Sequence, residues 1–457
     1  MRKTALVPIS KREASFETGA VPPINELKET GTCAPLAHLS INGSSRALRR
    51  DELNREAVLL TFCDPLPEQC SRLFTLSSSE WRRLSLWLDI SGLALYFLNR
   101  LNELGISELL PQAVSNRLHR NLLNNTARTN GMISESVGIQ QEFQMSSLSY
   151  ALLKGLSFWP NSVPRPELRS QFDLDFLVAA QSASKAREIL EGRGYRLYSI
   201  SGRSWEFKLN ERPGFTLKDI YKDLRSYAVE LHIQPGDQSS WSPLDRLEWR
   251  TFHGMSMPVL SPVDLFLGQG LHAYKHICGE FSRAAHLLEF RRHVLARRDD
   301  IDFWDELQWS AREHPPASLA LGVVTLLISR VMGDFAPKAL TSWTVCTLSR
   351  SVRLWIQVYG QRAVLGIYPG TKLYLLLQRE LAAAGVPAKR PIRQALLPSR
   401  LPPPVIRPFE HEALPVRLGR YHMQLKLILV RLRFHVVEGL RFLFESYRWR
   451  RLVRVVR

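Results

Sequence analysis

Two aspartates lie two residues apart in an otherwise apolar stretch of the sequence. Asp173 and Asp175 alternate with Phe172, Leu174 and Phe176. In a β-strand, residues i and i+2 point to the same face, so the two carboxylates project together and the apolar side chains face the core. Two adjacent anions beside a core are costly unless a cation neutralises them. We therefore expect Mg²⁺ (or Mn²⁺), which binds carboxylates together with substrate phosphates, and this chemistry indicates phosphoryl or nucleotidyl transfer.

An isolated pair of this kind is more often solvated or salt-bridged at a strand end, but neighbouring residues favour a functional site. Lys154 and Gly155 form a turn signal in which glycine lets the backbone approach a phosphate. Arg169 is a second potential phosphate partner. Glu230 and His232 share the polar face of a second strand-like run. A third carboxylate on a neighbouring strand is what a second metal or a general base requires.

The ordered series of motifs resembles the uncharacterised bacterial nucleotidyltransferase family of the polymerase-beta-like superfamily. The likeness covers roughly residues 85–345, and the series is far more specific than any single motif. The matching segments are Leu153-Lys154-Gly155, Arg169, Asp173-Leu174-Asp175-Phe176-Leu177-Val178, Gly194-Tyr195, Val229-Glu230-Leu231-His232, Leu260-Ser261-Pro262-Val263-Asp264, and the pair His272 and His276.

The resemblance implies an α+β fold, with a small mixed nucleotidyltransferase sheet, flanking helices, and helical regions before and after it. It implies transfer of a nucleoside monophosphate from an NTP to an unidentified acceptor that carries a hydroxyl or phosphate group. The implied catalytic and metal-binding residues are Asp173, Asp175 and Glu230. The implied nucleotide-binding residues are Lys154, Gly155, Arg169, Ser157 and Arg128. For Arg128 a surface salt bridge is an equally weighted alternative.

The sequence departs from the family pattern at three places. Gln171 and Phe172 replace the usual small residue before the first aspartate. The Gly-Ser phosphate turn appears as Lys154-Gly155, with Ser157 two residues later. Glu289 stands where such proteins tend to carry Asp. None of these changes removes an expected metal ligand.

Composition is that of an ordinary soluble chain. Of its 457 residues, 45% are hydrophobic and 23% charged, which allows several domains with substantial cores. The five cysteines show no metal-ligand spacing and indicate a reduced, cytoplasmic protein. The sequence shows neither a signal-peptide pattern nor an uncharged run of about 18 residues, so we expect no transmembrane segment.

We divide the chain into five segments. They are a flexible leader (1–50), a helical N-terminal region (51–145), the nucleotidyltransferase core (146–260), a helical domain (261–385), and a Pro-rich linker with a basic amphipathic tail (386–457). One long apolar helix face is expected around residues 84–98, and a further helix is expected to begin at Asn125.

The positive charge is concentrated in the tail. The net charge is +18, and residues 389–457 hold 16 Lys and Arg against 4 Asp and Glu. Apolar and basic residues interleave over 423–447, which is typical of an interfacial or partner-binding helix. We rank docking on the protein itself first, a membrane surface second and nucleic acid third. The main alternatives to an enzyme are thus a catalytically silent nucleotide-binding protein and an adaptor whose tail binds membrane or nucleic acid.

His272 and His276 lie one helical turn apart and could share a zinc ion. Ala273 follows His272, so the H-E-x-x-H pattern is not present. The sequence offers no third ligand at a clear spacing. We therefore expect these two histidines to be structural.

Overall fold

The computed structural model describes residues 46–209, 220–221, 228–234, 242–386, 391–397 and 414–456. The chain splits into two compact units, and everything described below belongs to the second, Ser44–Arg457. The first unit lies outside the described ranges, and with it most of the expected leader. Residues 46–50 of that segment form the start of a helix.

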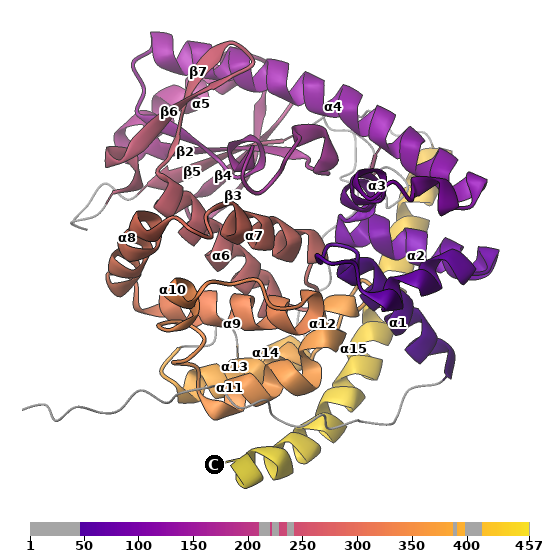
Figure 1. Ribbon diagram of the computed structural model, residues 1–457. Coiled ribbons are helices and arrows are strands. Elements are labelled where there is room, and N and C mark those ends of the chain that lie inside the picture. Colours follow the sequence, from indigo (N-terminus) through magenta and orange to yellow (C-terminus); the bar gives the residue numbers. More distant parts are fainter. Residues whose placement is uncertain are drawn as a thin grey trace, which may run out of the picture. The chain divides into compact units, whose positions relative to one another are not determined.

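The protein has an α+β fold, in which the strands of the described residues form one seven-stranded mixed sheet (Figure 1). The strand order is β3-β4-β5-β2-β1-β7-β6. The strands are β1 (Tyr150–Leu153), β2 (Asp173–Ala179), β3 (Arg196–Ser201), β4 (Ser204–Lys208), β5 (Ala228–Gln234), β6 (Leu247–Phe252) and β7 (Met255–Leu260). Strands β2 and β5, which carry the acidic motifs, are parallel neighbours, whereas β1 and β2 are antiparallel. The sequence pattern did not predict the hairpin of β6 and β7.

One face of the sheet is covered by the helices α4 (Gln112–Met145) and α5 (Ala183–Gly192). Side chains from both helices and from β2 and β5 form a continuous apolar core, which includes Phe143, Leu190, Phe176 and Val229. The alternation of apolar and polar residues along β2 explains this arrangement, because it sends Leu174 and Phe176 to the helices and the aspartates to the opposite face. The carboxylates therefore face away from α4.

The N-terminal helices differ from the sequence expectation in their boundaries. They are α1 (Arg46–Leu60), α2 (Ser78–Ser91) and α3 (Ala94–Glu103). The apolar residues expected on one long helix are buried, but they belong to α2 and α3, because Gly92 adopts a left-handed conformation (φ 77°) that ends α2. The helix expected to begin at Asn125 instead begins at Gln112, and it ends before β1.

The helices that follow the sheet form a second apolar core with α2 and α3. Helix α6 begins at the Leu260–Asp264 motif: Ser261 caps the helix through Asp264 N, and Pro262 occupies its first turn. The α-helices of this region are α6 (Pro262–Ile277), α7 (Ala284–Ala296), α8 (Ile301–Arg312), α9 (Pro315–Met332), α10 (Lys338–Thr341), α11 (Arg350–Trp355), α12 (Gln361–Leu365), α13 (Tyr374–Ala383) and α14 (Ile392–Leu396).

The chain ends in the long helix α15 (Leu414–Val456). One side of it packs on the protein through residues such as Phe442, Trp449 and Val453. Much of the expected linker, residues 387–390 and 398–413, lies outside the described residues. Among the helices of the described part, none is both long enough and apolar enough to cross a membrane.

Candidate active site

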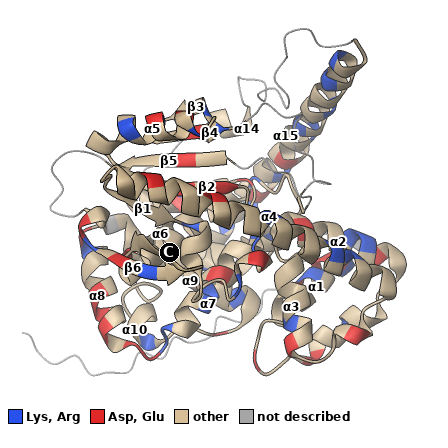
Figure 2. Ribbon diagram, turned by 90° about the horizontal axis from the view of Figure 1, so that it is seen from above, with Lys and Arg blue, Asp and Glu red and all other residues tan. Residues whose placement is uncertain are grey.

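Pairing of β2 with β5 brings the acidic motifs together. In the parallel register Asp175 lies opposite Glu230, and Leu177 lies opposite His232. Figure 2 shows acidic residues on both strands. Val229 and Leu231 are fully buried in the core behind the sheet, so Glu230 and His232 point to the same side as the aspartates.

Asp175 is the most strongly engaged of the three carboxylates. Its Oδ1 accepts a hydrogen bond from Lys154 Nζ at 2.8 Å and lies 2.7 Å from His232 Nε2. Its side chain is only 3% exposed. His232 Nε2 also lies 3.5 Å from Glu230 Oε2, and Ser204 Oγ donates to the same oxygen at 3.3 Å. Lys154 thus donates to Asp175 at the centre of the site, and the His232 ring nitrogen lies within hydrogen-bond distance of the same carboxylate.

The carboxylates differ in their electrostatics. Burial opposes ionisation of Asp175, but the His232 hydrogen bond and the charge of Lys154 outweigh it and lower its pKa. The pKa of Asp173 is raised by burial and by repulsion from Asp175. Burial and the same two aspartates raise the pKa of Glu230. A cation bound here would relieve the repulsion among the three groups.

The donor set fits a divalent metal. One ligand atom each from Asp175, Glu230 and His232 lie within 4.8 Å of one another. Two carboxylate oxygens and an imidazole nitrogen suit Mg²⁺, Mn²⁺ or a later transition metal. Asp173 is not part of this group, although it lies on the same strand face. His232 was seen in the sequence only as a neighbour of Glu230, and its i+2 spacing was the signal for its role.

The turn after β1 holds Lys154 in a strained backbone conformation. Lys154 has φ 46°, and Gly155 has φ 43°. A positive φ costs a non-glycine residue about 1–3 kcal/mol and is typical of functional sites. A Cβ at Gly155 would lie 2.7 Å from Gln171 Oε1 and would require that side chain to shift, and the positive φ of Gly155 also favours glycine. Ser157 is buried, and its hydroxyl donates to the Lys154 carbonyl at 2.8 Å, which stabilises the turn.

Arg169 is held by protein groups. Its Nε lies 3.1 Å from Glu289 Oε1, and its Nη1 donates to Gln171 Oε1 at 3.0 Å. Tyr96 donates to the same Glu289 oxygen at 2.9 Å. Two of the departures from the family pattern, Gln171 and Glu289, therefore position this guanidinium.

Arg128 is buried, with 2% of its surface exposed, so it does not lie on the surface. Its Nη1 donates to the carbonyl of Ile220 at 2.7 Å, its Nη2 donates to Asn125, and its guanidinium stacks over Phe172 at 4.4 Å. These contacts connect α4 to the chain segments around β2. Direct contact of Arg128 with a nucleotide stays a prediction.

Comparison with known proteins identifies the family. The sequence profile of a family described as uncharacterised nucleotidyltransferases matches residues 77–333, which is more than half of the chain. The chain belongs to this family of uncharacterised nucleotidyltransferases. No curated protein matches it significantly. Among solved structures, an antigenic nucleotidyltransferase-like protein from Paracoccidioides brasiliensis is similar at 16% identity, with a TM-score of 0.26, over 48% of this chain and 96% of the other.

This nucleotidyltransferase-family chain also has a histidine cluster in the helices that follow the sheet. His272 and His276 of α6 meet His286 of α7, with ring centroids 4.6–4.8 Å apart. Burial, followed by His276 and nearby cations including Lys154 and Arg169, lowers the pKa of His272 to about 3. The sequence offered no third histidine at a recognisable spacing, because His286 comes from another helix.

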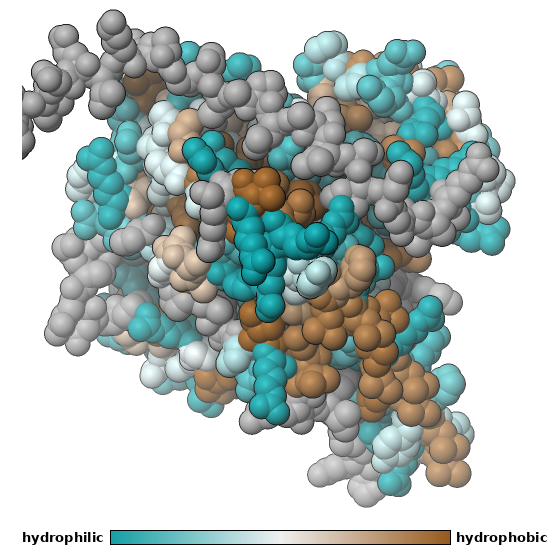
Figure 3. Space-filling view, turned by 90° about the horizontal axis from the view of Figure 1, so that it is seen from below, coloured by the Kyte–Doolittle hydropathy of each residue, from teal (hydrophilic) through white to brown (hydrophobic). Residues whose placement is uncertain are grey.

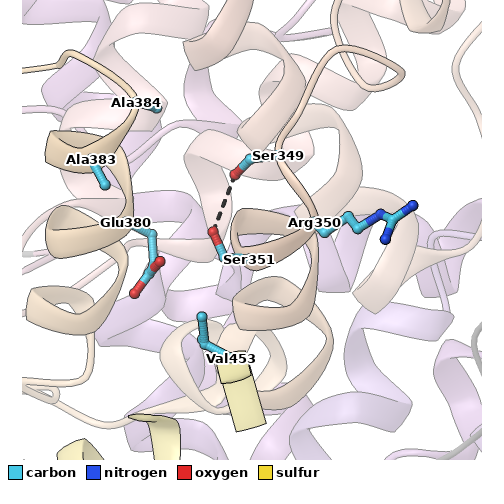
Figure 4. A pocket seen from close by; sticks show the side chains of 7 residues that line it. All are labelled: Ser349, Arg350, Ser351, Glu380, Ala383, Ala384 and Val453. Carbon is cyan, nitrogen blue, oxygen red and sulfur yellow. Dashed lines mark hydrogen bonds between the residues drawn. The ribbon is translucent and has the colours of Figure 1, made fainter. Parts of the chain in front are cut away.

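A pocket elsewhere in the chain is separate from the carboxylate site on β2 and β5 (Figure 4). It is lined by residues of α11, α13 and α15, by the residue before α11 and by the residue after α13. They are Ser349, Arg350, Ser351, Glu380, Ala383, Ala384 and Val453. None of them belongs to the sites described above.

Proposed function

We propose that the protein transfers a nucleoside monophosphate from an NTP, such as ATP, to an acceptor with a hydroxyl or phosphate group. The observation that carries this proposal is the β2–β5 register, which sets Glu230 beside Asp175. Family membership supports the same reaction class. A cytoplasmic location agrees with the use of an NTP and stays a prediction.

Asp173, Asp175 and Glu230 would hold Mg²⁺ (or Mn²⁺), with His232 as a further ligand or as a hydrogen-bond donor to Asp175. When bound, the ion would neutralise the triphosphate and the departing pyrophosphate. Lys154 is 31% exposed beside Asp175 and is the residue best placed to contact a phosphate oxygen. Arg169 adds positive charge from its buried position.

In the proposed reaction the acceptor oxygen attacks the α-phosphorus of the NTP. The bond from that phosphorus to the bridging oxygen breaks, and pyrophosphate leaves. Glu230 would either complete the metal site or take the acceptor proton. Its raised pKa suits the second of these roles, because a general base works best with a pKa nearer the operating pH.

Mg²⁺-dependent pyrophosphate release from labelled NTPs in the presence of cell extract tests this proposal. Asp173→Asn and Asp175→Asn should each reduce release at least about 100-fold, and Glu230→Gln should reduce it about 10²–10⁴-fold while some nucleotide binding remains. The matched control is Glu206→Gln. Glu206 lies opposite Glu230 on β4, but its carboxylate is engaged by Ser199 and Lys208. Aspartate variants that keep wild-type rates would overturn the metal assignment.

A second role is proposed for α15, which presents an apolar stripe to solvent (Figure 3). The stripe repeats every three or four residues and so follows one helix face. Its members, each more than half exposed, are Leu418, Tyr421, Leu425, Leu429, Leu432, Val436, Leu440, Leu443 and Tyr447. Exposed basic residues such as Lys426, Arg433 and Arg450 lie along the same helix.

We propose that this face binds an anionic membrane surface, because apolar insertion combined with basic side chains is the pattern of interfacial helices. Full-length protein should co-sediment with vesicles that contain anionic lipid, and less with neutral vesicles. Leu432→Glu combined with Leu440→Glu should abolish this binding. Dimerisation through the stripe, or salt-dependent binding of nucleic acid without vesicle binding, would overturn the membrane assignment.

A further inference from the structure

Three imidazoles converge between α6 and α7. His272 and His276 occupy adjacent turns of α6, and His286 lies in the first turn of α7. One ring nitrogen from each lies within 4.8 Å of the other two. In a tetrahedral zinc site with Zn–N of about 2.0–2.1 Å, ligand nitrogens lie about 3.4 Å apart. Small side-chain rotations would therefore bring the three rings to ligand positions.

Burial and hydrogen bonding distinguish this cluster from three histidines that merely fill space. His286 is only 8% exposed, and its Nδ1 is buried without a hydrogen-bond partner. An unsatisfied buried polar atom costs about 1–3 kcal/mol and calls for an explanation. His276 forms a hydrogen bond with the main chain of Phe281. Metal-bound histidines are usually oriented by such a contact through their second ring nitrogen.

Access and ligand type favour a zinc ion. His272 and His276 are partly exposed, so an ion can reach the cluster from solvent, while His286 forms its buried end. Imidazole nitrogens suit zinc and neighbouring transition metals, whereas Mg²⁺ prefers oxygen.

We propose that His272, His276 and His286 bind one zinc ion, with a fourth position left for water or hydroxide. This site is distinct from the carboxylate site on the sheet, and it does not depend on the proposed nucleotidyl transfer. The expectation from sequence, that His272 and His276 are structural, would then be replaced by a metal role. The third ligand from α7 is what changes the interpretation.

The test is metal analysis of full-length protein purified without a histidine tag. We expect about one zinc per chain by mass spectrometry. After removal of metal by chelation, Co²⁺ should give visible absorption bands of a tetrahedral site, and zinc should raise the melting temperature. His272→Gln, a substitution at a partly exposed position, should lower zinc affinity more than about 100-fold, since even contacts behind metal ligands contribute 10–100-fold.

Two control variants locate the zinc. His232→Gln removes the imidazole of the carboxylate site and should leave the zinc content unchanged. His293→Gln removes another buried histidine of α7, whose ring is hydrogen-bonded to Gln269, and should also retain zinc. Wild-type protein that binds neither zinc nor Co²⁺ would overturn the proposal, and so would His272→Gln protein with a full complement of zinc. The wild-type measurement decides the question even where a variant fails to fold.

Discussion

Asp173 and Asp175 are two residues apart, but their surroundings shift their pKa values in opposite directions. Lys154 and His232 both contact Asp175 and favour its ionised form. The charges of Arg169 and Lys154 and a backbone hydrogen bond favour ionisation of Asp173, but burial and Asp175 outweigh them and raise its pKa. The sequence alone suggests that replacing either aspartate leaves stability unchanged or slightly higher. The structure distinguishes the two.

The first prediction concerns the stability of the metal-free protein at neutral pH. Asp173→Asn should raise the free energy of unfolding, because it removes a buried charge that repels Asp175. Asp175→Asn should lower it by roughly 1.5–3 kcal/mol, the usual contribution of hydrogen bonds to a charged group. Urea unfolding in the presence of a chelator measures both. Equal effects of the two substitutions would contradict the assigned partners of Asp175.

The second prediction concerns Asp89, whose pKa is raised by burial to about 6 despite its pairing with Arg117. A carboxyl with a raised folded-state pKa stabilises the protein below its unfolded-state pKa, and this stabilisation is lost as pH rises to about 6. The loss is at most roughly 3 kcal/mol. Asp89→Asn should therefore flatten the decline in melting temperature between about pH 4 and pH 6. Parallel wild-type and variant profiles would show that Asp89 ionises normally.

Among the elements, helix α6 connects the sheet to the helical core and carries two of the clustered histidines. It packs closely on α9 and α7 at Gly270, where a Cβ would lie 2.4 Å from Leu321 Cδ2 and 3.2 Å from Phe290 Cε2. At Gly268, half a turn earlier, a Cβ would meet nothing within 4 Å. Close helix packing therefore requires glycine at position 270 but not at position 268.

The third prediction is that alanine at these two positions changes stability with opposite sign. Gly270→Ala should destabilise the protein by about 1–3 kcal/mol, because it overpacks the contact with α9. Gly268→Ala should stabilise it by up to about 1 kcal/mol, since alanine is the better helix former. Chemical denaturation of both variants supplies the measurement, and each serves as the control for the other. A neutral Gly270→Ala would mean that α6 and α9 are less closely packed.

At the scale of the whole molecule, the C-terminal helix α15 packs on the helical core through one face only. Trp449 is fully buried, and its Nε1 donates to Glu380 Oε1 at 2.9 Å. Tyr359 and Thr371 donate to the buried Glu445 and Glu438 at 2.8 Å each. The opposite face carries the exposed apolar stripe. One side of the helix is therefore docked on the protein itself, which was the interpretation ranked first from the sequence. The other side is open to a partner.

The fourth prediction separates the two faces of α15. Trp449→Ala should cost about 3–5 kcal/mol, the usual effect of removing a buried aromatic side chain. Phe444→Ala, at a position 69% exposed, should change stability by less than about 0.5 kcal/mol. Urea unfolding of both variants, monitored by far-ultraviolet circular dichroism, compares them. This signal does not depend on the removed indole. A small effect at Trp449 would show that α15 is not docked in solution.

The sequence by itself determined which residues could form the site. The period-two alternation around Asp173 and around Glu230 assigns each side chain to a face of its strand, because successive strand residues point to opposite sides. The resemblance to the family implied the α+β class, and the composition of residues 386–457 indicated a basic amphipathic tail. These features are local, so they can be read from neighbouring residues.

Only the tertiary structure decided which of these residues meet. The register of β2 on β5 sets Asp175 beside Glu230. It also brings His232 Nε2 within 2.7 Å of Asp175 Oδ1. The packing of α7 on α6 adds His286 to the histidine pair, and the buried position of Arg128 follows from contacts with segments distant in sequence. Such contacts depend on strand order and helix packing. Many different sequences are compatible with the same strand order and packing. For that reason no spacing along the chain identifies His286 as the third histidine or Ile220 as a partner of Arg128.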